Sequence, residues 1–167
     1  GCGASSEGYA AFSNFFPASF EYEGQHFEHS EQALMYEKAR VFGDRDAQEA
    51  ILAAKEPRAA KKLGRCVKPY NDDVWSAVRL PLMTRILYAK FGQDPSLRKL
   101  LVGTKDWTIV EAAPRDRIWG VGVGMEKARD PRNWRGANLL GHALMLAREL
   151  LKSDAPMPGR PTIPAAA

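Results

Sequence analysis

The sequence predicts one α+β domain that is mainly helical and carries a small β-sheet. Its 167 residues match the usual length of a single domain. Hydrophobic residues make up 45% and charged residues 26%, a balance that excludes wholesale disorder. Strand-like segments are few, short and mixed with many helix-like segments, which argues against a repeating βαβ fold. A domain of this size buries roughly two-thirds of its unfolded surface, so it needs no disulfide or metal for stability.

β-Structure is predicted in three places. Residues 9–16 are rich in aromatic side chains and end before a proline, which favours a strand. Residues 20–22 alternate apolar and polar side chains, Glu23-Gly24 can turn, and residues 25–27 return, so this stretch predicts a hairpin. Residues 107–112, with the sequence WTIVEA, predict one further strand.

Helices are predicted where capping residues, first-turn prolines and terminal glycines bracket an apolar pattern. Ser30 and Asp44 can cap helices, Pro57 suits a first turn, and Gly43 and Gly103 suit helix ends. Between the last strand and the last helix, residues 119–134 predict a loop that contains glycine and arginine. The expected helices cover residues 30–42, 44–55, 57–64, 71 or 72 to 91, 94–103 and 138–151.

The chain divides into a flexible N-terminus at residues 1–8, a domain at residues 9–152, and a tail. The tail, residues 153–167, holds four prolines and no apolar period, and is expected to be disordered. No segment approaches the ~20 apolar residues of a membrane span, and no leader or disulfide framework is visible. We therefore expect an intracellular protein, cytoplasmic or nuclear, that is monomeric and binds no membrane. The net charge of +4 permits an anionic substrate but does not by itself indicate nucleic-acid binding.

Two charged residues occupy the apolar stripe of the predicted helix at residues 30–42. Lys38 follows Glu31 by seven residues, which returns within about 20° of the same direction on a helix. Charges are rarely placed on a buried stripe unless they are paired or functional. The two residues are about 10.5 Å apart along the helix axis, and the lysine leans back toward the glutamate, so a small reacting centre fits between them.

Two structural explanations of these charges compete with a functional one. Glu31 can satisfy backbone N–H groups at the helix start while Lys38 extends to solvent. Alternatively, the two side chains form a buried ion pair in a purely structural domain.

Tryptophan and glycine provide two further signals. Trp75 lies in the first turn of a predicted helix and Trp119 at a loop edge, where each can stack a base or simply pack in the core. The glycine-rich stretch at residues 119–141 runs into the helix at Asn138, and such a helix start can present N–H donors to a phosphate. Its glycines do not fit a dinucleotide-binding pattern, and a solvated basic loop is the alternative. The three histidines lack metal-ligand spacing, so no metal site is predicted.

The order of several short motifs resembles the NADAR family, which has a YbiA-like fold. The resemblance spans residues 12–151 and implies an N-glycosidase that acts on ribosides carrying phosphate. Two activities are associated with such proteins: removal of ADP-ribose from ADP-ribosylated guanine bases, and cleavage of phosphoribosyl intermediates of riboflavin biosynthesis. The motifs are 12-FSNF-15, 30-SEQALMYEKA-39, Trp75, 90-KF-91, 116-DRIWG-120 and 138-NLLGHALMLARELL-151.

The resemblance also implies roles for individual residues, with no cofactor and no metal. Glu31, Lys38 and Asp116 correspond to catalytic positions. Residues expected to bind the substrate are Ser13, Asn14, Phe15, Trp75, Trp119, Gly120, Gly122, Asn138 and Leu140.

One departure from the family pattern favours the ADP-ribosyl-guanine branch. Some riboflavin-linked members carry an acidic residue directly after the Trp-Gly pair, where this chain has Val121. The sequence also shows no fused riboflavin-pathway domain. We therefore expect ADP-ribose or an ADP-ribosylated guanine nucleotide or nucleic acid as the substrate. The alternatives are the riboflavin intermediates and a non-catalytic ADP-ribose-binding module.

The expected mechanism uses Lys38 as the nucleophile and Glu31 as the proton carrier. A neutral lysine can attack the anomeric carbon, open the ribose and form a Schiff base that water hydrolyses. Lowering a lysine pKa from ~10.4 to about 7 requires roughly 4–5 kcal/mol, which desolvation can supply and a nearby carboxylate opposes. The carboxylate can instead take the amine proton during attack, or stabilise an oxocarbenium-like transition state.

Overall fold

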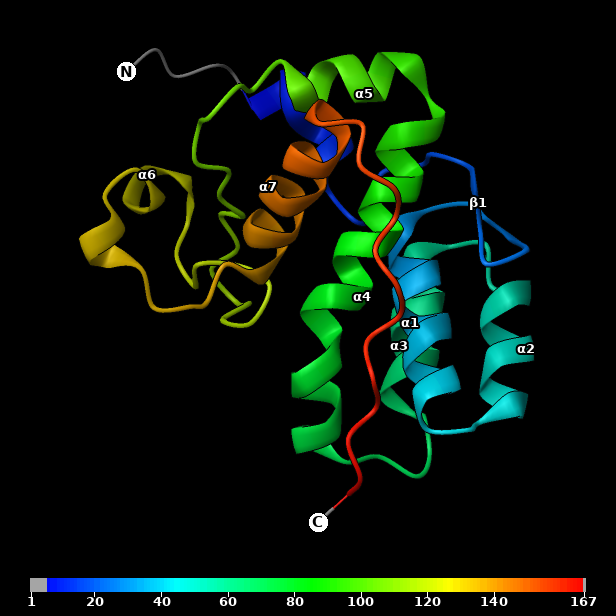
Figure 1. Cartoon of the computed structure of the whole chain (residues 1–167). Coiled ribbons are helices and arrows are strands. Elements are labelled where there is room, and N and C mark those ends of the chain that lie inside the picture. The colour runs from blue at the N-terminus through cyan, green and yellow to red at the C-terminus, as the bar shows by residue number, and fades with distance from the viewer. Residues whose placement is uncertain (1–5, 167) are drawn as a thin grey trace.

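The computed structural model describes residues 6–166 and is mainly helical, as the sequence predicts (Figure 1). A two-stranded antiparallel sheet is the only sheet in this described part of the chain. In chain order the elements are the 3₁₀ helix η1 (Ser6–Phe12), β1 (Phe20–Tyr22), β2 (Gln25–Phe27), α1 (Ser30–Val41), α2 (Arg45–Ala53), α3 (Pro57–Arg65), α4 (Asp72–Gln93), α5 (Pro95–Val102), α6 (Met125–Ala128), the 3₁₀ helix η2 (Pro131–Asn133) and α7 (Leu139–Lys152).

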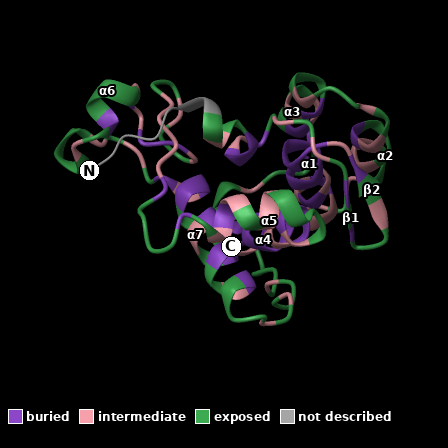
Figure 2. Cartoon of the chain, turned by 90° about the horizontal axis from the view of Figure 1, so that it is seen from above, coloured by how far each residue is buried: buried purple, intermediate pink, exposed green. Residues whose placement is uncertain are grey.

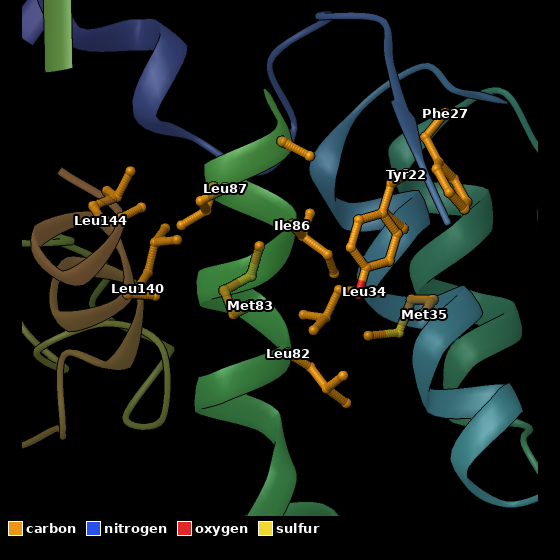
Figure 3. Packing of buried hydrophobic residues seen from close by; sticks show 14 of the residues in the cluster. Tyr22, Phe27, Leu34, Met35, Leu82, Met83, Ile86, Leu87, Leu140 and Leu144 are labelled. Carbon is orange, nitrogen blue, oxygen red and sulfur yellow. The ribbon is translucent and has the colours of Figure 1, made fainter. Parts of the chain in front are cut away.

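The long helix α4 is the centre of the fold, because the other large elements pack on opposite sides of it. Figure 3 shows α1 and the hairpin on one side of α4 and α7 on the other. Leu82 and Ile86 of α4 are fully buried, as is Leu34 of α1. Each such side chain contributes about 1.5–3 kcal/mol through burial. Figure 2 shows the matching pattern of exposure: buried residues line α1, whereas exposed residues cover the outer faces of α2, α3 and α6.

The predicted hairpin forms with Phe20 opposite Phe27. Glu23 and Gly24 both adopt positive φ, of 50° and 73°, as the tightest two-residue hairpin turn requires. Tyr22 is buried and faces α1 and α4, so the hairpin is held by packing as well as by its own hydrogen bonds.

Two of the predicted strands are wrong. Within residues 9–16, the chain to Phe12 is a 3₁₀ helix, whose Phe12 ring packs 5.7 Å from the Phe91 ring. Residues 107–112 are irregular because their polar backbone groups are satisfied without a neighbouring strand. The side chain of Asn138 donates to the Ile109 carbonyl and accepts from the Glu111 N–H.

Two of the helix ends that differ from the predictions have a clear structural reason. His29, not Ser30, caps α1, and its Nδ1 accepts from the Gln32 N–H at 3.1 Å. Gly64 lies inside α3 and does not end it. A glycine stands at this position because α3 touches α1 there. A Cβ there would sit 2.0 Å from the Met35 sulfur, so glycine allows the close approach of the two helices.

The C-terminal segment makes contacts that differ from the expected disordered tail. From Ala155 it runs along α4 without helix or strand (Figure 1). The Tyr88 hydroxyl donates to the Ala155 carbonyl, Arg85 donates to the Pro158 carbonyl, and Arg160 pairs with Glu37. The fully buried Glu37 carboxylate attracts this arginine, a long-range requirement that local composition does not reveal. Of the expected flexible N-terminus, residues 1–5 lie outside the described residues, and the chain from Ser6 forms η1.

Among the helices that the structure describes, none is both long enough and apolar enough to cross a membrane.

We predict that Gly141→Ala strongly destabilises the protein, because α7 approaches the irregular segment too closely for a side chain there. A Cβ at Gly141 would lie 2.1 Å from the Ile109 carbonyl oxygen. Urea denaturation should show a loss of about 2–3 kcal/mol, or no folded protein. The control, Gly92→Ala in α4, meets only the flexible end of Leu151 at 3.2 Å and should stay within about 1 kcal/mol. Equal effects of the two variants would contradict this account.

Candidate active site

A cavity of about 200 Å³ lies between α1, α3, the start of α4 and the loop that precedes α7. Glu31 and Lys38 both line it, together with Trp75 and Trp119. The charged stripe predicted on α1 therefore opens into a hollow instead of being sealed in the core. We call this hollow the active-site cavity.

Contacts with the preceding segment fix the position of Glu31. The Asn14 carbonyl accepts the Glu31 N–H at 3.0 Å, and the Asn14 side chain accepts the Ser30 hydroxyl at 2.9 Å. Lys90, which is itself buried, donates to the Ser13 carbonyl at 3.1 Å and so anchors the same segment to α4. The first turn of α1 is thus clamped where it presents the carboxyl group.

Glu31 is only 7% exposed, and burial raises the pKa of its carboxyl group from 4.5 to about 7. The charge of Asp116 raises the pKa further, whereas Lys61, Arg65 and Lys38 lower it. Burial outweighs the nearby cations. A pKa raised toward neutrality suits a carboxyl group that both donates and accepts a proton.

Lys38 is half-buried, and desolvation lowers the pKa of its amine, with Arg65 acting in the same direction. Glu31 and Asp72 oppose this shift but are weaker than desolvation. The Lys38 Nζ lies 4.6 Å from the centroid of the Tyr70 ring. This cation–π contact favours the charged amine, so the lowered pKa of Lys38 comes from desolvation in spite of it.

Asp116 positions the loop that carries Trp119 and does not line the active-site cavity. Its Oδ1 accepts the backbone N–H groups of Ile118 and Trp119 at 2.9 and 2.8 Å. Its charge still acts on Glu31 by raising that pKa. The structure therefore gives this predicted catalytic residue a positioning role.

Several predicted substrate-binding residues lie outside the active-site cavity, in structural positions. Asn14 supports the start of α1, the Ser13 hydroxyl accepts the Phe15 N–H, and Leu140 packs in the core. Asn138 is buried, with its side chain bonded to the segment at residues 109–111. Phe15 is 37% exposed and borders a neighbouring cavity.

The predicted phosphate-binding helix start is already occupied by the protein backbone. The N–H groups of residues 137–140 donate to the carbonyl groups of residues 117–120, including that of Gly120. The Gly122 N–H donates to the Asp116 carbonyl. The N-terminus of α7 therefore has no free donors for an anion at these positions.

Three basic residues that were not among the predicted site residues line the active-site cavity. Lys61 and Arg65 come from one face of α3, and Arg79 comes from α4. The Arg79 Nε is buried and has no hydrogen-bond partner among the described residues. The spacing of four between Lys61 and Arg65 was a visible signal, since it places both on one helix face. Tyr70 and Asp72, also unpredicted, complete the rim near Lys38.

The fold and the site together define a class: a small helical domain with an acid, an amine, aromatic rings and basic side chains around one cavity. No three His, Cys, Asp or Glu side chains of the described residues are grouped as metal ligands. The NADAR domain family matches residues 2–152, so the chain belongs to the NADAR family.

Relatives from a virus and from a bacterium carry names that describe an activity. The N-glycosidase R617 of Acanthamoeba polyphaga mimivirus is 38% identical, over 89% of this chain and 92% of its own length. The riboflavin biosynthesis protein VVA0006 of Vibrio vulnificus is 31% identical over 90% of this chain, but the match covers 38% of that protein.

The YbiA proteins agree in both sequence and structure. The N-glycosidase YbiA of Shigella flexneri is 34% identical, over 89% of this chain and 85% of its own length. The NMR structure of the E. coli protein YbiA superposes with a TM-score of 0.73 at 32% identity, covering 89% of this chain and 82% of that chain. The YbiA-like fold expected from the sequence is confirmed.

The raised pKa of Glu31 predicts that Glu31→Gln stabilises the protein at high pH. The folded chain binds the Glu31 proton more tightly than the unfolded chain, whose pKa is about 4.5. This stabilisation is complete below about pH 4.5 and is lost as the pH rises through about 7, a cost of about 3 kcal/mol at pH 8. Denaturation at pH 8 should therefore show Glu31→Gln to be the more stable form, with little difference at pH 4.5.

Glu37→Gln is the matched control on the same helix. Glu37 is fully buried and paired with Arg40 and Arg160, so its neutralisation should cost several kcal/mol at pH 8. A destabilised Glu31→Gln at pH 8 would instead make Glu31 and Lys38 a structural ion pair.

Proposed function

We propose that the chain is an N-glycosidase that removes ADP-ribose from ADP-ribosylated guanine bases. The observation that carries the proposal is the shared cavity, in which an acid with a pKa of about 7 and an amine with a lowered pKa face one hollow. The names of R617 and YbiA support the glycosidase class. Val121, which replaces the acidic residue of some riboflavin-linked members, supports the guanine branch.

The first step breaks the bond to the base. The neutral Lys38 amine attacks the anomeric carbon while the bond between that carbon and the base nitrogen breaks. Glu31 in its protonated form gives its proton to the departing nitrogen, so the base leaves neutral. A pKa near the working pH suits this transfer, because both protonation states of the carboxyl group are well populated.

The second step opens and releases the sugar. The Glu31 carboxylate takes a proton from the newly bonded nitrogen and passes it to the ring oxygen as the ring C–O bond breaks, which leaves a protonated imine between Lys38 and the sugar. Water then adds to the imine carbon, and one of its protons passes to the nitrogen. The C–N bond breaks to release the neutral Lys38 amine, and the remaining proton returns to the Glu31 carboxylate. ADP-ribose is released as an open-chain aldehyde that recloses, and one water is consumed in total.

The walls of the cavity provide substrate binding. Trp119 is half-buried and lies beside Ile118 at the cavity edge, where an aromatic face can stack a base. Lys61, Arg65 and Arg79 are placed to neutralise phosphate charge. The helix start at Asn138 is not assigned to the phosphates, because the N–H groups of residues 137–140 are already bonded to the backbone.

Cleavage of phosphoribosyl intermediates of riboflavin biosynthesis is the second candidate function. The likeness to VVA0006 favours it, and the active-site cavity of about 200 Å³ suits a small phosphoribosyl substrate. The same residues would perform the same chemistry, so a direct comparison of substrates is required.

Incubation with ADP-ribosylated guanosine, followed by mass spectrometry, tests the proposed function. We expect free ADP-ribose and the unmodified guanosine, at a higher kcat/KM than for a phosphoribosylamino-pyrimidine intermediate. The reverse preference would assign the protein to riboflavin chemistry. Binding of ADP-ribose without turnover of either substrate would make it a binding module.

Borohydride reduction should trap the sugar covalently on Lys38. Reduction converts the imine to a stable secondary amine, so the intact protein should gain the mass of the reduced ADP-ribosyl group. Lys38→Met should abolish this adduct, whereas Lys62→Met, an exposed neighbour on α3 outside the cavity, should still form it. Full activity of Lys38→Met would remove the nucleophile role.

Trp119→Ala should raise KM with a smaller effect on kcat. Loss of one stacked base costs about 1–3 kcal/mol, which corresponds to a rise of roughly 5- to 150-fold. Trp107→Ala is the control, since that side chain is 49% exposed and lies outside the cavity. Steady-state kinetics that show an unchanged KM for Trp119→Ala would reject the stacking role.

A further inference from the structure

Lys90 of α4 is a buried cation that the proposed mechanism does not use. It is only 1% exposed, and no carboxylate among the described residues offsets the desolvation that lowers the pKa of its amine to about 7. A buried charge without an ionic partner is costly, and an apolar side chain of similar length would avoid that cost. The lysine therefore has a role that an apolar side chain could not fill.

The amine of Lys90 is surrounded by the segment that precedes the hairpin. Its Nζ donates to the Ala11 carbonyl at 2.8 Å and to the Ser13 carbonyl at 3.1 Å. The same atom lies 5.8 Å from the centroid of the Phe16 ring. Carbonyl oxygens and aromatic faces both attract an ammonium group. One amine thus fixes several points of residues 11–16, which we call the anchored segment.

The anchored segment connects Lys90 to Glu31. Asn14 contacts both helices, because its Nδ2 donates to the Met83 sulfur of α4 at 3.5 Å and its Oδ1 accepts the Ser30 hydroxyl of α1 at 2.9 Å. The Asn14 carbonyl accepts the Glu31 N–H at 3.0 Å. The first N–H groups of a helix have no partner within the helix, so this carbonyl holds a donor that the helix itself leaves free. A continuous path of contacts therefore runs from the Lys90 amine to the Glu31 backbone.

We propose that Lys90 is a positioning residue for the N-glycosidase reaction: by holding the anchored segment, it keeps the Glu31 carboxyl group in its desolvated place on the wall of the active-site cavity. Lys90 does not itself line that cavity. The inference rests on the proposed function only in taking Glu31 as the proton carrier. Without the amine, the first turn of α1 should shift and admit water to the carboxyl group.

A direct effect of the Lys90 charge on Glu31 would have the opposite sign. Loss of a nearby cation raises the pKa of a carboxyl group, whereas access of water lowers a pKa that burial has raised. Burial is the largest cause of the raised Glu31 pKa, and the Lys90 charge is not among the causes that the described residues provide. The charged groups that act on Glu31 or line its cavity are Lys38 on α1, Lys61 and Arg65 on α3, Asp72 and Arg79 on α4, and Asp116 in the loop before α7.

A carbon-13 NMR titration of the glutamate carboxyl groups in Lys90→Met tests the proposal. Methionine removes the amine but keeps an unbranched apolar side chain that fills the core. The Glu31 pKa should fall from about 7 by at least about one unit toward its ordinary value of 4.5. The signal that is absent from Glu31→Gln identifies the Glu31 resonance. This measurement needs no substrate, so its outcome does not depend on whether ADP-ribosylated guanosine is cleaved.

The pH dependence of catalysis provides a second readout, with whichever substrate of the proposed function the wild-type protein cleaves. Protonated Glu31 gives its proton to the departing base, so the alkaline limb of kcat should move about one pH unit lower in Lys90→Met, a loss of about tenfold at pH 8. KM should change less than about twofold, because Lys90 does not line the cavity.

Arg85→Met is the matched control on the same helix. Arg85 is a buried cation that donates to the Tyr22 hydroxyl and the Pro158 carbonyl, outside the anchored segment. Its loss should leave the Glu31 pKa within about 0.3 unit and kcat within about twofold, since the two sites share no partner.

Ser30→Ala interrupts the same path at a later point, where the hydroxyl bonds to Asn14. It should also lower the Glu31 pKa, and Lys90→Met added to it should lower that pKa by less than the sum of the two single effects. An unchanged or raised Glu31 pKa in Lys90→Met, an equal fall in Arg85→Met, or full additivity with Ser30→Ala would overturn the positioning role. Failure of Lys90→Met to fold would also overturn it, because Lys90 would then be a requirement of the fold.

Discussion

Desolvation of one carboxyl group is the constraint on which the site depends. Glu31 sits in the first turn of α1, and the segment before the helix holds it there through the Asn14 carbonyl and side chain. That segment is in turn held by Lys90, whose buried amine donates to the Ala11 and Ser13 carbonyls. Burial also lowers the pKa of Lys90 to about 7. The residue that anchors this segment is therefore itself destabilised in its charged form by desolvation.

Helix α1 treats its two buried acids in opposite ways. Glu37 is fully buried but accepts from the Tyr22 hydroxyl and from Arg40 and Arg160. Glu31 faces a cavity, and the cations near it do not restore an ordinary pKa. On the same helix, Glu37 is fully hydrogen-bonded and links the hairpin to the C-terminal segment. Glu31 keeps a raised pKa, which is typical of carboxyl groups at functional sites.

The sequence predicted the helices and the hairpin well because their signals are local. Asp44, Asn71 and Asp94 cap helices as their side chains suggest, and Glu23-Gly24 forms the turn. The stripe of α1 likewise placed two residues together, since helical periodicity is a local property. The strand predictions were less accurate. Residues 107–112 have a strand-like composition, but a strand needs a neighbouring strand as its hydrogen-bond partner. Here the Asn138 side chain makes hydrogen bonds to this backbone instead. Non-local contacts also explain why the sequence placed an anion-binding site at the start of α7, whereas the basic residues that line the cavity come from α3 and α4.

The contact of Arg160 with Glu37 has a consequence for synthesis on the ribosome. These two residues are separated by 123 positions in the chain, so α1 is synthesised long before the arginine. A nascent chain that has folded its early helices still holds a buried carboxylate short of one cation. The packing around α1 should therefore remain incomplete, and its apolar side chains accessible to chaperones, until residue 160 has left the exit tunnel.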